Sequence, residues 1–310
     1  MVQQLTQQLP DKLPDTKEFE AVDELDTSHL VIEDDAPVDN LQSAQQQRLL
    51  VNALCGSKAI SAPFVAEANV GLFYQLKGDP VVPDMLLSLG IQRAEDFSQR
   101  QHRAYFVWEF GKVPDVCVEV VSNKEGDEVA LSQRSKRKGK QRSKQEVYAQ
   151  IGVPYYVVFD PLQQIQDEPN MNGALLRVWT LTSGRYVELT PDEGIAEVGQ
   201  SVWLETVGLG LTLWEGEFEE KVSRMWLRWC DRQGRILPTG IERADTEQQR
   251  ADTEQQRADT EQQRADTEQQ RADTEQQRAD TEQQRADAEQ QRANRLAERL
   301  RSLGIDPDEA

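Results

Sequence analysis

Apolar residues gather between residues 48 and 230, in short runs with the periods of strands and helices, while both ends of the chain are polar. Three of these runs predict buried strands, at Val81–Leu89, at the valine-rich Val113–Asn123 and at Pro154–Asp160. Between the last two, Glu128–Ile151 is expected to be helical at least in its second half. Strand, helix and strand in this order predict a crossover connection and therefore a parallel pair within a mixed sheet.

Shorter patterns supply the rest of the predicted fold. Leu41–Ala53 predicts a helix, Val70–Leu76 a strand, and Ala104–Phe110 a further apolar stretch. Leu175–Leu181 and Arg185–Leu189 flank a Thr-Ser-Gly sequence, which predicts a hairpin. We therefore expect an α/β fold in which a mixed β-sheet is flanked by helices, followed by a long C-terminal α-helix.

The polar ends set the predicted domain boundaries. Residues 1–40 hold eleven acidic residues against two lysines, so we expect a disordered segment that serves as a solubilising leader or a regulatory tail. Residues 41–240 are predicted to form one globular domain, and residues 241–310 a helix built from heptad repeats. The formal net charge of −20 would argue against a nucleic acid as partner, but much of the excess lies in these flanks.

Cysteine and histidine usage indicates a reducing compartment and gives no sign of zinc. The three cysteines are far apart and odd in number, and the two histidines do not combine with them in a zinc-binding spacing. Residues 1–10 do not have the pattern of a signal peptide, and no apolar run is long enough to span a bilayer. We expect a cytoplasmic protein with no membrane partner.

A seven-residue repeat dominates the C-terminal part of the chain. The sequence ADTEQQR occurs six times from Ala244 and is followed by ADAEQQR at 286–292. The repeat predicts a helix over Ile241–Leu303, on the order of 95 Å long at about 1.5 Å per residue. Glutamate and arginine three or four positions apart make a chain of surface ion pairs available. We expect a solvated single helix or a weak leucine-anchored assembly, so a homo-oligomer could form through this helix or through the globular domain.

Two acids interrupt the buried run at Val113–Asn123. Because side chains alternate between the faces of a strand, Asp115 and Glu119 are expected to point the same way. Buried acids are costly unless they are paired, protonated or bound to a cation. One interpretation is a divalent metal site. The other is one acid at an exposed strand end and one acid paired to a lysine or arginine.

Asp84 and Lys144 could join Glu119, since one lies in a predicted neighbouring strand and the other begins the predicted helix. An acid on each of two adjacent strands can chelate one Mg²⁺, which favours carboxylate oxygens and retained waters. A nearby lysine can orient a water and stabilise charge that builds on a phosphate.

Residues 134–144 carry seven lysines or arginines in eleven positions. This run is interpreted either as a solvated insertion or as a surface that contacts DNA phosphates, and its place beside the acidic residues favours phosphate contact. No aromatic residue interleaves the run, so base stacking is not indicated. The phosphate-contact residues would be Arg134, Lys136, Arg137, Lys138, Lys140 and Arg142.

Three motifs carry a resemblance to a known family: VVPDMLLSL at 81–89, VPDVCVEVVSN at 113–123 and KQEVYAQIGVPYYVVFDP at 144–161. In this order they resemble the PD-(D/E)XK nuclease superfamily and, more closely, its Uma-type restriction endonuclease family. The resemblance covers roughly residues 41–240, and the last motif is its most specific part. It implies a restriction-endonuclease-like fold and a metal-dependent endonuclease that hydrolyses phosphodiester bonds of DNA.

The resemblance also implies roles for individual residues. Asp84 and Glu119 take the two acid positions that bind Mg²⁺ or Mn²⁺, and together with Lys144 they would form the catalytic set. The superfamily lysine normally stands two residues after the second acid, where this chain has Val121, but some variants place it on the following helix, as Lys144 would be. Asp115 would either support the metal site or begin the strand.

Two other functions are compatible with the sequence. A catalytically inactive DNA-binding or regulatory domain on the same fold would bind DNA in a salt-sensitive manner without metal-dependent cleavage. An interaction protein whose long helix is the working part would associate in a concentration-dependent manner. The inactive form would be favoured if the basic run disturbed the helix that begins at Lys144.

Overall fold

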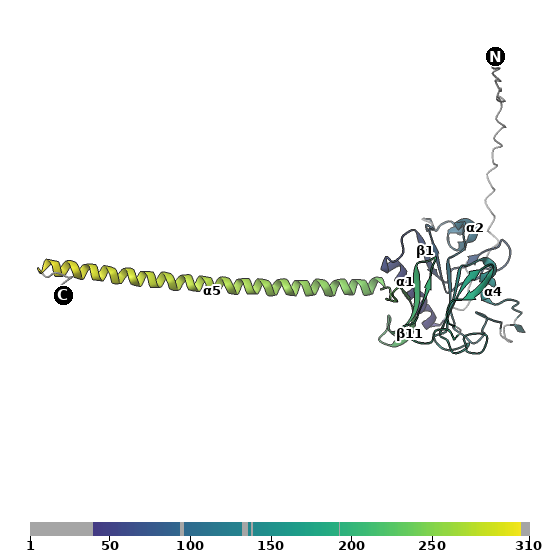
Figure 1. Ribbon diagram of the computed structural model, residues 1–310. Helices are drawn as coiled ribbons and strands as arrows, with labels where there is room; N and C mark the ends of the chain where they lie inside the picture. The colour runs from purple at the N-terminus through teal and green to yellow at the C-terminus, as the bar shows by residue number, and fades with distance from the viewer. Residues whose placement is uncertain (1–39, 94–95, 132–135, 138, 192, 305–310) are drawn as a thin grey trace, which may run out of the picture. The chain divides into compact units, whose positions relative to one another are not determined.

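The computed structural model describes residues 40–93, 96–131, 136–137, 139–191 and 193–304 (Figure 1). The chain divides into two compact units, residues 1–239 and residues 240–310, which are described separately. The acidic residues 1–39 lie outside the described residues, so the disorder expected there stays a prediction.

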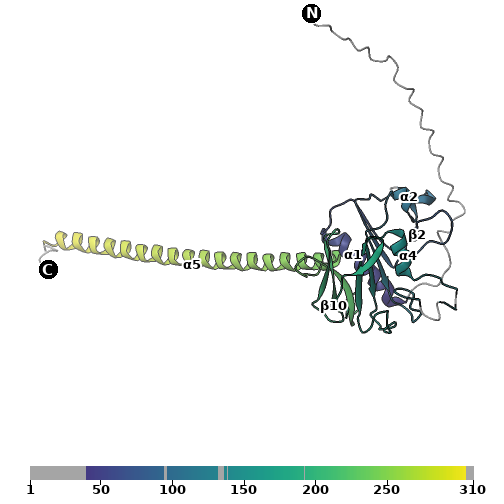
Figure 2. The same ribbon diagram turned by 45° about the vertical axis from the view of Figure 1, so that its right-hand side comes forward.

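A six-stranded mixed sheet forms the centre of the first unit, in the order β1-β3-β5-β6-β7-β8. Its strands are β1 (Phe64–Ala68), β3 (Met85–Leu89), β5 (Val116–Val120), β6 (Tyr155–Phe159), β7 (Leu176–Thr182) and β8 (Arg185–Glu188). β5 and β6 are parallel, and the other neighbouring pairs are antiparallel. Helix α4 (Lys144–Ile151) connects β5 to β6 in the sequence and lies against the sheet (Figure 2). The predicted crossover and the predicted mixed sheet flanked by helices are therefore confirmed.

Smaller elements complete this unit. They are helices α1 (Leu41–Ser57) and α2 (Val107–Phe110), the 3₁₀ helix η1 (Arg100–His102), and strands β2 (Leu72–Phe73), β4 (Tyr105–Phe106), β9 (Ser201–Leu204), β10 (Leu209–Glu217) and β11 (Ser223–Cys230). β2 and β4 form a short parallel pair, while β9, β10 and β11 form a second, antiparallel sheet. Because α1 packs against β1, β3 and β11, it links the two larger sheets.

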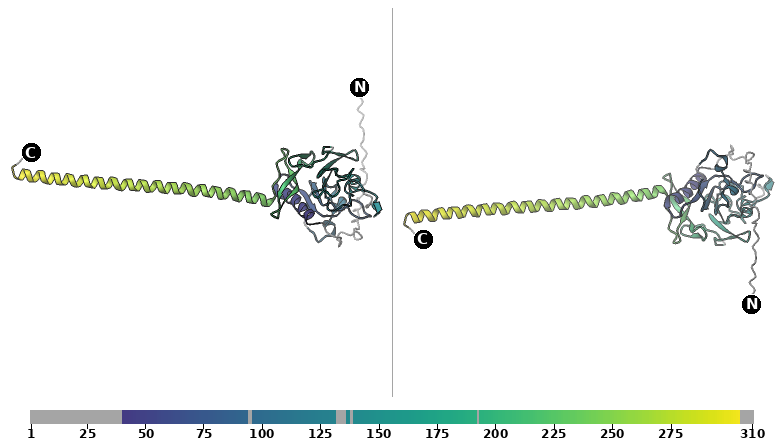
Figure 3. Two further views of the ribbon diagram at one scale, coloured as in Figure 1. Left: turned by 90° about the horizontal axis from the view of Figure 1, so that it is seen from below. Right: turned by 90° about the horizontal axis from the view of Figure 1, so that it is seen from above.

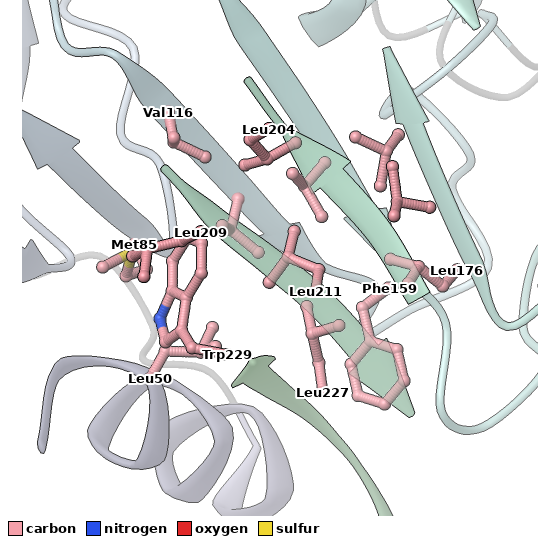
Figure 4. Packing of buried hydrophobic residues seen from close by; sticks show 14 of the residues in the cluster. Leu50, Met85, Val116, Phe159, Leu176, Leu204, Leu209, Leu211, Leu227 and Trp229 are labelled. Atoms are coloured by element: carbon pink, nitrogen blue, oxygen red, sulfur yellow. The ribbon is translucent and has the colours of Figure 1, made fainter. Parts of the chain in front are cut away.

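Buried apolar side chains form two main clusters, one on each face of the six-stranded sheet, because side chains alternate along its strands. On β5, Val116 faces the cluster that contains Leu50 of α1 and Trp229 of β11 (Figure 4). Cys117, the next residue, faces the other cluster, which contains Tyr148 of α4. The second face of the sheet is therefore the one covered by the helix that follows the basic run.

Two predicted strands are shorter than expected. The strand predicted at Val81–Leu89 begins at Met85, after Pro83, which has no N–H to donate to a ladder. Of the strand predicted at Val70–Leu76, Leu72 and Phe73 pair, and the preceding strand β1 was not predicted. The predicted apolar stretch at Ala104–Phe110 divides into β4 and α2.

The second unit consists of helix α5 (Gly240–Ser302), which matches the predicted helix to within one residue at each end (Figure 3). Its repeating side-chain contact differs from the expected chain of ion pairs. Nε2 of Gln248 donates to Oδ1 of Asp252 at 2.8 Å, and the same glutamine–aspartate bond recurs along the repeat. Arg243 and Glu247, four residues apart at the start of the helix, form an ion pair at 3.6 Å, and the rest of the expected ion-pair chain stays a prediction. Neither α5 nor any other helix among the described residues is both long and apolar enough to cross a bilayer.

Candidate active site

Asp84 lies immediately before β3 and faces β5. Extending the antiparallel register of these strands places it opposite Glu119. Its Oδ2 accepts a hydrogen bond from the backbone N–H of Val120 at 2.6 Å, and its Oδ1 accepts one from Nε2 of Gln47 in α1 at 3.0 Å. Asp84 is 7% exposed, so the carboxylate is fixed by two donors at the edge of the core.

Glu119 lies within β5 and is 1% exposed. Its Oε2 accepts from Nζ of Lys144 at 2.6 Å, and its Oε1 accepts from the hydroxyl of Tyr148 at 2.6 Å. Lys144 and Tyr148 are four residues apart in α4, so they lie on the same face of the helix. One turn of α4 therefore binds both oxygens of the second predicted acid.

The first turn of α4 is fixed by a capping box. The Ser143 hydroxyl accepts from the N–H of Glu146, and the Glu146 carboxylate accepts from the N–H of Ser143. The N–H of Lys144 also donates to the carbonyl of Asp127 at 2.7 Å. The basic run ahead of this helix therefore does not prevent Lys144 from reaching Glu119.

The charges in this cluster are strongly coupled. Burial alone would lower the pKa of Lys144, but the carboxylates of Glu119, Asp84 and Glu128 together raise that pKa above its ordinary value. Burial raises the pKa of Glu119, and the nearby Lys144 and Tyr148 oppose that rise. Lys144 is therefore a charged donor at neutral pH, so it is unsuited to act as a general base.

Glu128 is a third acid at the site, and the sequence did not indicate it. It is 4% exposed, and its Oε2 is buried without a hydrogen-bond partner. Burial raises the pKa of Glu128 to about 7, with Lys144 opposing and Asp127 reinforcing the rise. Glu128 lies in a loop, where neither a strand period nor a helix period surrounds it. The sequence therefore gives no pattern that would identify it as a site residue.

Asp115 lies at the other end of β5. Its Oδ2 accepts from the N–H of Leu89 and from Nζ of Lys112, both at 2.7 Å. It lies four positions before Glu119, which corresponds to about 13 Å along an extended chain. With these partners, the structure does not bring Asp115 together with Asp84 and Glu119.

The last two residues proposed for phosphate contact have protein partners. Lys140 forms an ion pair with Asp127, which is 6% exposed, and Arg142 hydrogen-bonds Gln150 of α4. Lys140 therefore helps to neutralise the loop beside Glu128.

The other four residues proposed for phosphate contact precede Lys140 in the basic run. Lys136 and Arg137 are exposed, while Arg134 and Lys138 lie outside the described residues. Phosphate contact by the basic run therefore stays a prediction.

Two further residues that sequence reasoning missed come from α1 and the β1–β2 connection. Gln47, besides donating to Asp84, accepts from Nδ2 of Asn69 at 3.0 Å. The three consecutive glutamines at 45–47 are all buried, which is unusual for polar residues of a helix. The sequence of this glutamine-rich helix does not indicate which of its faces is buried, so the role of Gln47 becomes visible only in the structure.

The chemistry of the two carboxylates fits a hard divalent cation. Mg²⁺ and Mn²⁺ prefer carboxylate oxygens, and each oxygen of Asp84 and Glu119 can accept more than the hydrogen bond described above. Burial disfavours the charged form of Glu119, and a cation beside it would favour that form. Within the described part of the chain, no group of three or more His, Cys, Asp or Glu side chains could hold a metal. An ion bound here would need water or substrate oxygens as its remaining ligands.

Comparison with known proteins adds one finding to this geometry. A family model described as "Uma2: Putative restriction endonuclease" matches residues 24–205, more than half of the chain. The matched region contains Asp84, Glu119 and Lys144. No curated protein gives a match to this chain.

Proposed function

The chain belongs to the Uma2 family, and from this membership we propose that it is a metal-dependent DNA endonuclease that hydrolyses phosphodiester bonds. Asp84 and Glu119 would hold the divalent cation, Mg²⁺ or Mn²⁺. Lys144 would complete the catalytic set.

One observation carries the proposal. The Lys144 ammonium lies 2.6 Å from Glu119, and Asp84, immediately before the adjacent strand, contributes to the field that keeps this lysine charged. Two acids and one amine from three separate elements therefore meet at one end of β5. Three such groups, largely withdrawn from water, are costly for a structure that has no use for them.

Each residue would have a distinct role in hydrolysis. The protonated Lys144 can donate to a phosphate oxygen or to the attacking water and stabilise the charge that develops in the transition state. Gln47 and Tyr148 would hold the two carboxylates in orientation, since each donates to one of their oxygens. A divalent cation, when bound, would supply Lewis-acid polarisation of the phosphate.

A nicking assay tests the proposal directly. Supercoiled plasmid is incubated with the purified full chain and a panel of divalent metals, with EDTA as the blank. We expect nicking with Mg²⁺ or Mn²⁺ that is lost in Glu119→Gln and in Lys144→Met. Nicking that persists in Glu119→Gln would reject the site assignment.

A second function is favoured by a specific observation. Every carboxylate oxygen of Asp84 and Glu119 already accepts a hydrogen bond from the protein, as expected of a site that has become structural. A catalytically inactive DNA-binding domain would then bind DNA in a salt-sensitive manner and leave plasmid intact with every metal. The same assay, run beside a binding measurement, separates the two functions.

A further inference from the structure

A cavity of about 350 Å³ lies on the face of the sheet that carries Glu119. Its apolar walls include Val65 of β1, Leu86 of β3, Tyr105 of β4 and Phe110 of α2. All four belong to, or pack against, the same buried cluster as Tyr148, the tyrosine that binds Glu119. The cavity and the acidic site are thus built on one continuous layer of side chains.

The cavity is close to the first acid. Asp84, immediately before β3, lies two residues from Leu86, and the register with β5 places both side chains on one face, with Cα atoms about 7 Å apart. Glu67, another lining residue, is the partner of Leu86 across the β1–β3 ladder. A nucleotide whose phosphate lay at Asp84 would have its base within reach of this cavity.

We propose that this cavity receives one unstacked base of the DNA strand that is cut. The inference rests on the proposed function and sharpens its substrate class. The preferred substrate would be DNA with a nucleotide that is unpaired or easily extruded beside the scissile phosphate, in place of regular duplex.

The aromatic side chains suit a planar guest. The rings of Tyr105 and Phe110 stack with their centroids 4.5 Å apart, and both rings line the cavity. Bases stack on aromatic side chains irrespective of sequence, because every base has a π-face. The volume lies at the lower end of the range for ligand pockets, which favours one small planar group over a longer chain.

The polar groups of the cavity suit a nucleotide more than an apolar ligand. The carboxylate of Glu67 and the guanidinium of Arg93 form an ion pair in the wall, and together they present acceptors and donors to the edge of a base. His102 and Arg103 also line the cavity. The guanidinium groups of Arg93 and Arg103 complement the phosphates on either side of an extruded base.

The first test uses the unaltered full chain and three DNA duplexes of the same sequence. One is fully paired, one has a single-nucleotide bulge, and one has the same bulge with an abasic nucleotide. Binding is measured by fluorescence anisotropy in EDTA, and cleavage is measured with Mg²⁺ or Mn²⁺. We expect the bulged duplex to be bound at least tenfold more tightly than both others. Equal affinity for the base-bearing and abasic bulges would overturn the proposal.

A filled cavity provides the second test. Val70 lines the cavity and is partly exposed, so Val70→Trp should fill the space from its rim. The matched control is Val187→Trp, at an exposed position on β8, the opposite edge of the sheet. We expect Val70→Trp to lose the preference for the bulged base while keeping the affinity for the abasic bulge, and Val187→Trp to keep both.

The two proposals fail differently. Absence of cleavage with every metal, together with a retained preference for the bulged base, would reject the endonuclease and leave the base-binding cavity in place. Cleavage without any preference among the three duplexes would reject the cavity and leave the endonuclease. A preference that survives in a folded Val70→Trp protein would also reject the cavity.

Discussion

The two ends of β5 carry the same kind of side chain in different surroundings. The period of two along a strand predicts that Asp115 and Glu119 point to the same face. Asp115 has a side chain that is 19% exposed and is neutralised by Lys112, three residues away in the sequence. Glu119 is 1% exposed, and its partners Lys144 and Tyr148 come from a helix more than twenty residues later.

This difference shows what separates a structural acid from a candidate catalytic acid. Asp115 receives a backbone N–H and a local lysine, which together anchor the entry to β5. Glu119 binds a lysine and a tyrosine from a distant helix, and the buried Glu128 beside it keeps one oxygen without a hydrogen-bond partner. Burial, partners distant in the sequence and the unpartnered oxygen of Glu128 mark the end of β5 where function is expected.

We expect the largest effect from a matched pair of substitutions, one at each of these two acids. Glu119→Gln removes the charge that faces Lys144, and we expect Mg²⁺- or Mn²⁺-dependent nicking to fall by more than about 100-fold, beyond the range usual for outer partners of a metal site. Asp115→Asn removes the charge that faces Lys112, in a partly exposed ion pair worth about 1 kcal/mol or less. Its nicking rate should therefore stay near that of the unaltered chain.

Initial nicking rates and denaturant unfolding curves of both variants check this pair. If Asp115→Asn abolished nicking while its unfolding curve stayed unchanged, Asp115 would not be a merely structural acid. Equal loss of nicking in both variants would also contradict the distinction between the two ends of β5.

The second prediction concerns pH. Glu128 has a pKa raised to about 7 from an ordinary 4.5, mainly by burial, with Lys144 opposing the rise and Asp127 and Glu119 reinforcing it. Between these values the folded protein binds more protons at this site than the unfolded chain does, so stability falls as pH rises through that window. Glu128→Gln removes the cost of the buried charge. We expect it to raise the free energy of unfolding above pH 7 by up to about 3 kcal/mol.

Urea unfolding in EDTA across this pH range measures the effect. The unaltered chain should lose stability between pH 4.5 and 7, and the Glu128→Gln protein should lose less. Glu197→Gln, at an exposed position, is the matched control and should follow the unaltered chain. Identical pH profiles for Glu128→Gln and Glu197→Gln would show that the Glu128 carboxyl is not perturbed by its surroundings.

The third prediction isolates the tyrosine that binds Glu119. Tyr148→Phe keeps the buried ring, which lies 5.1 Å from that of Tyr156, and removes the hydroxyl that donates to Glu119. We expect nicking to fall roughly 10–100-fold, with more Mg²⁺ needed for half-maximal rate, as is typical when a ligand loses its orienting partner. Tyr186→Phe, which loses a hydrogen bond to the carbonyl of Val153 in the same cluster, is the control. If both variants needed the same increase in Mg²⁺, the effect of Tyr148→Phe would come from altered packing of the cluster and not from the lost hydrogen bond to Glu119.

Much of the fold could be predicted, because periodicity is a local property of the sequence. The valine-rich run, the helix that starts at Lys144 and the strand at 155–159 were all visible as patterns, and their order gave the parallel pair. β1 was missed because Phe64–Ala68 is short, contains two alanines and a glutamate, and directly follows Pro63. Tertiary pairing with β3, and not local preference, makes it a strand.

The site could be predicted in part for the same reason. Asp84, Glu119 and Lys144 lie on elements whose order places them near one another, and the structure brings these three together. Gln47 and Glu128 could not be found, because one lies in a helix whose buried face is set by packing against both larger sheets and the other lies in an irregular loop. Whether a carboxylate in a loop lies near a lysine depends on the tertiary fold. The hydrophobic periodicity of the sequence does not indicate it.

We expect the smallest effect from a change in α5, where the polar contacts are exposed and join residues close in the sequence. Its glutamine–aspartate bonds join residues four apart and contribute about 0.2–0.5 kcal/mol each. Deleting residues 251–264 removes two whole repeats and keeps the heptad phase. All six tryptophans precede residue 240, so their fluorescence reports the unfolding of the first unit, while far-UV circular dichroism reports the loss of helix. We expect less helical signal, an unfolding free energy unchanged within about 0.5 kcal/mol, and unchanged nicking. A nicking rate that drops, and that depends more steeply on protein concentration, would instead make the helix an assembly element that the endonuclease requires.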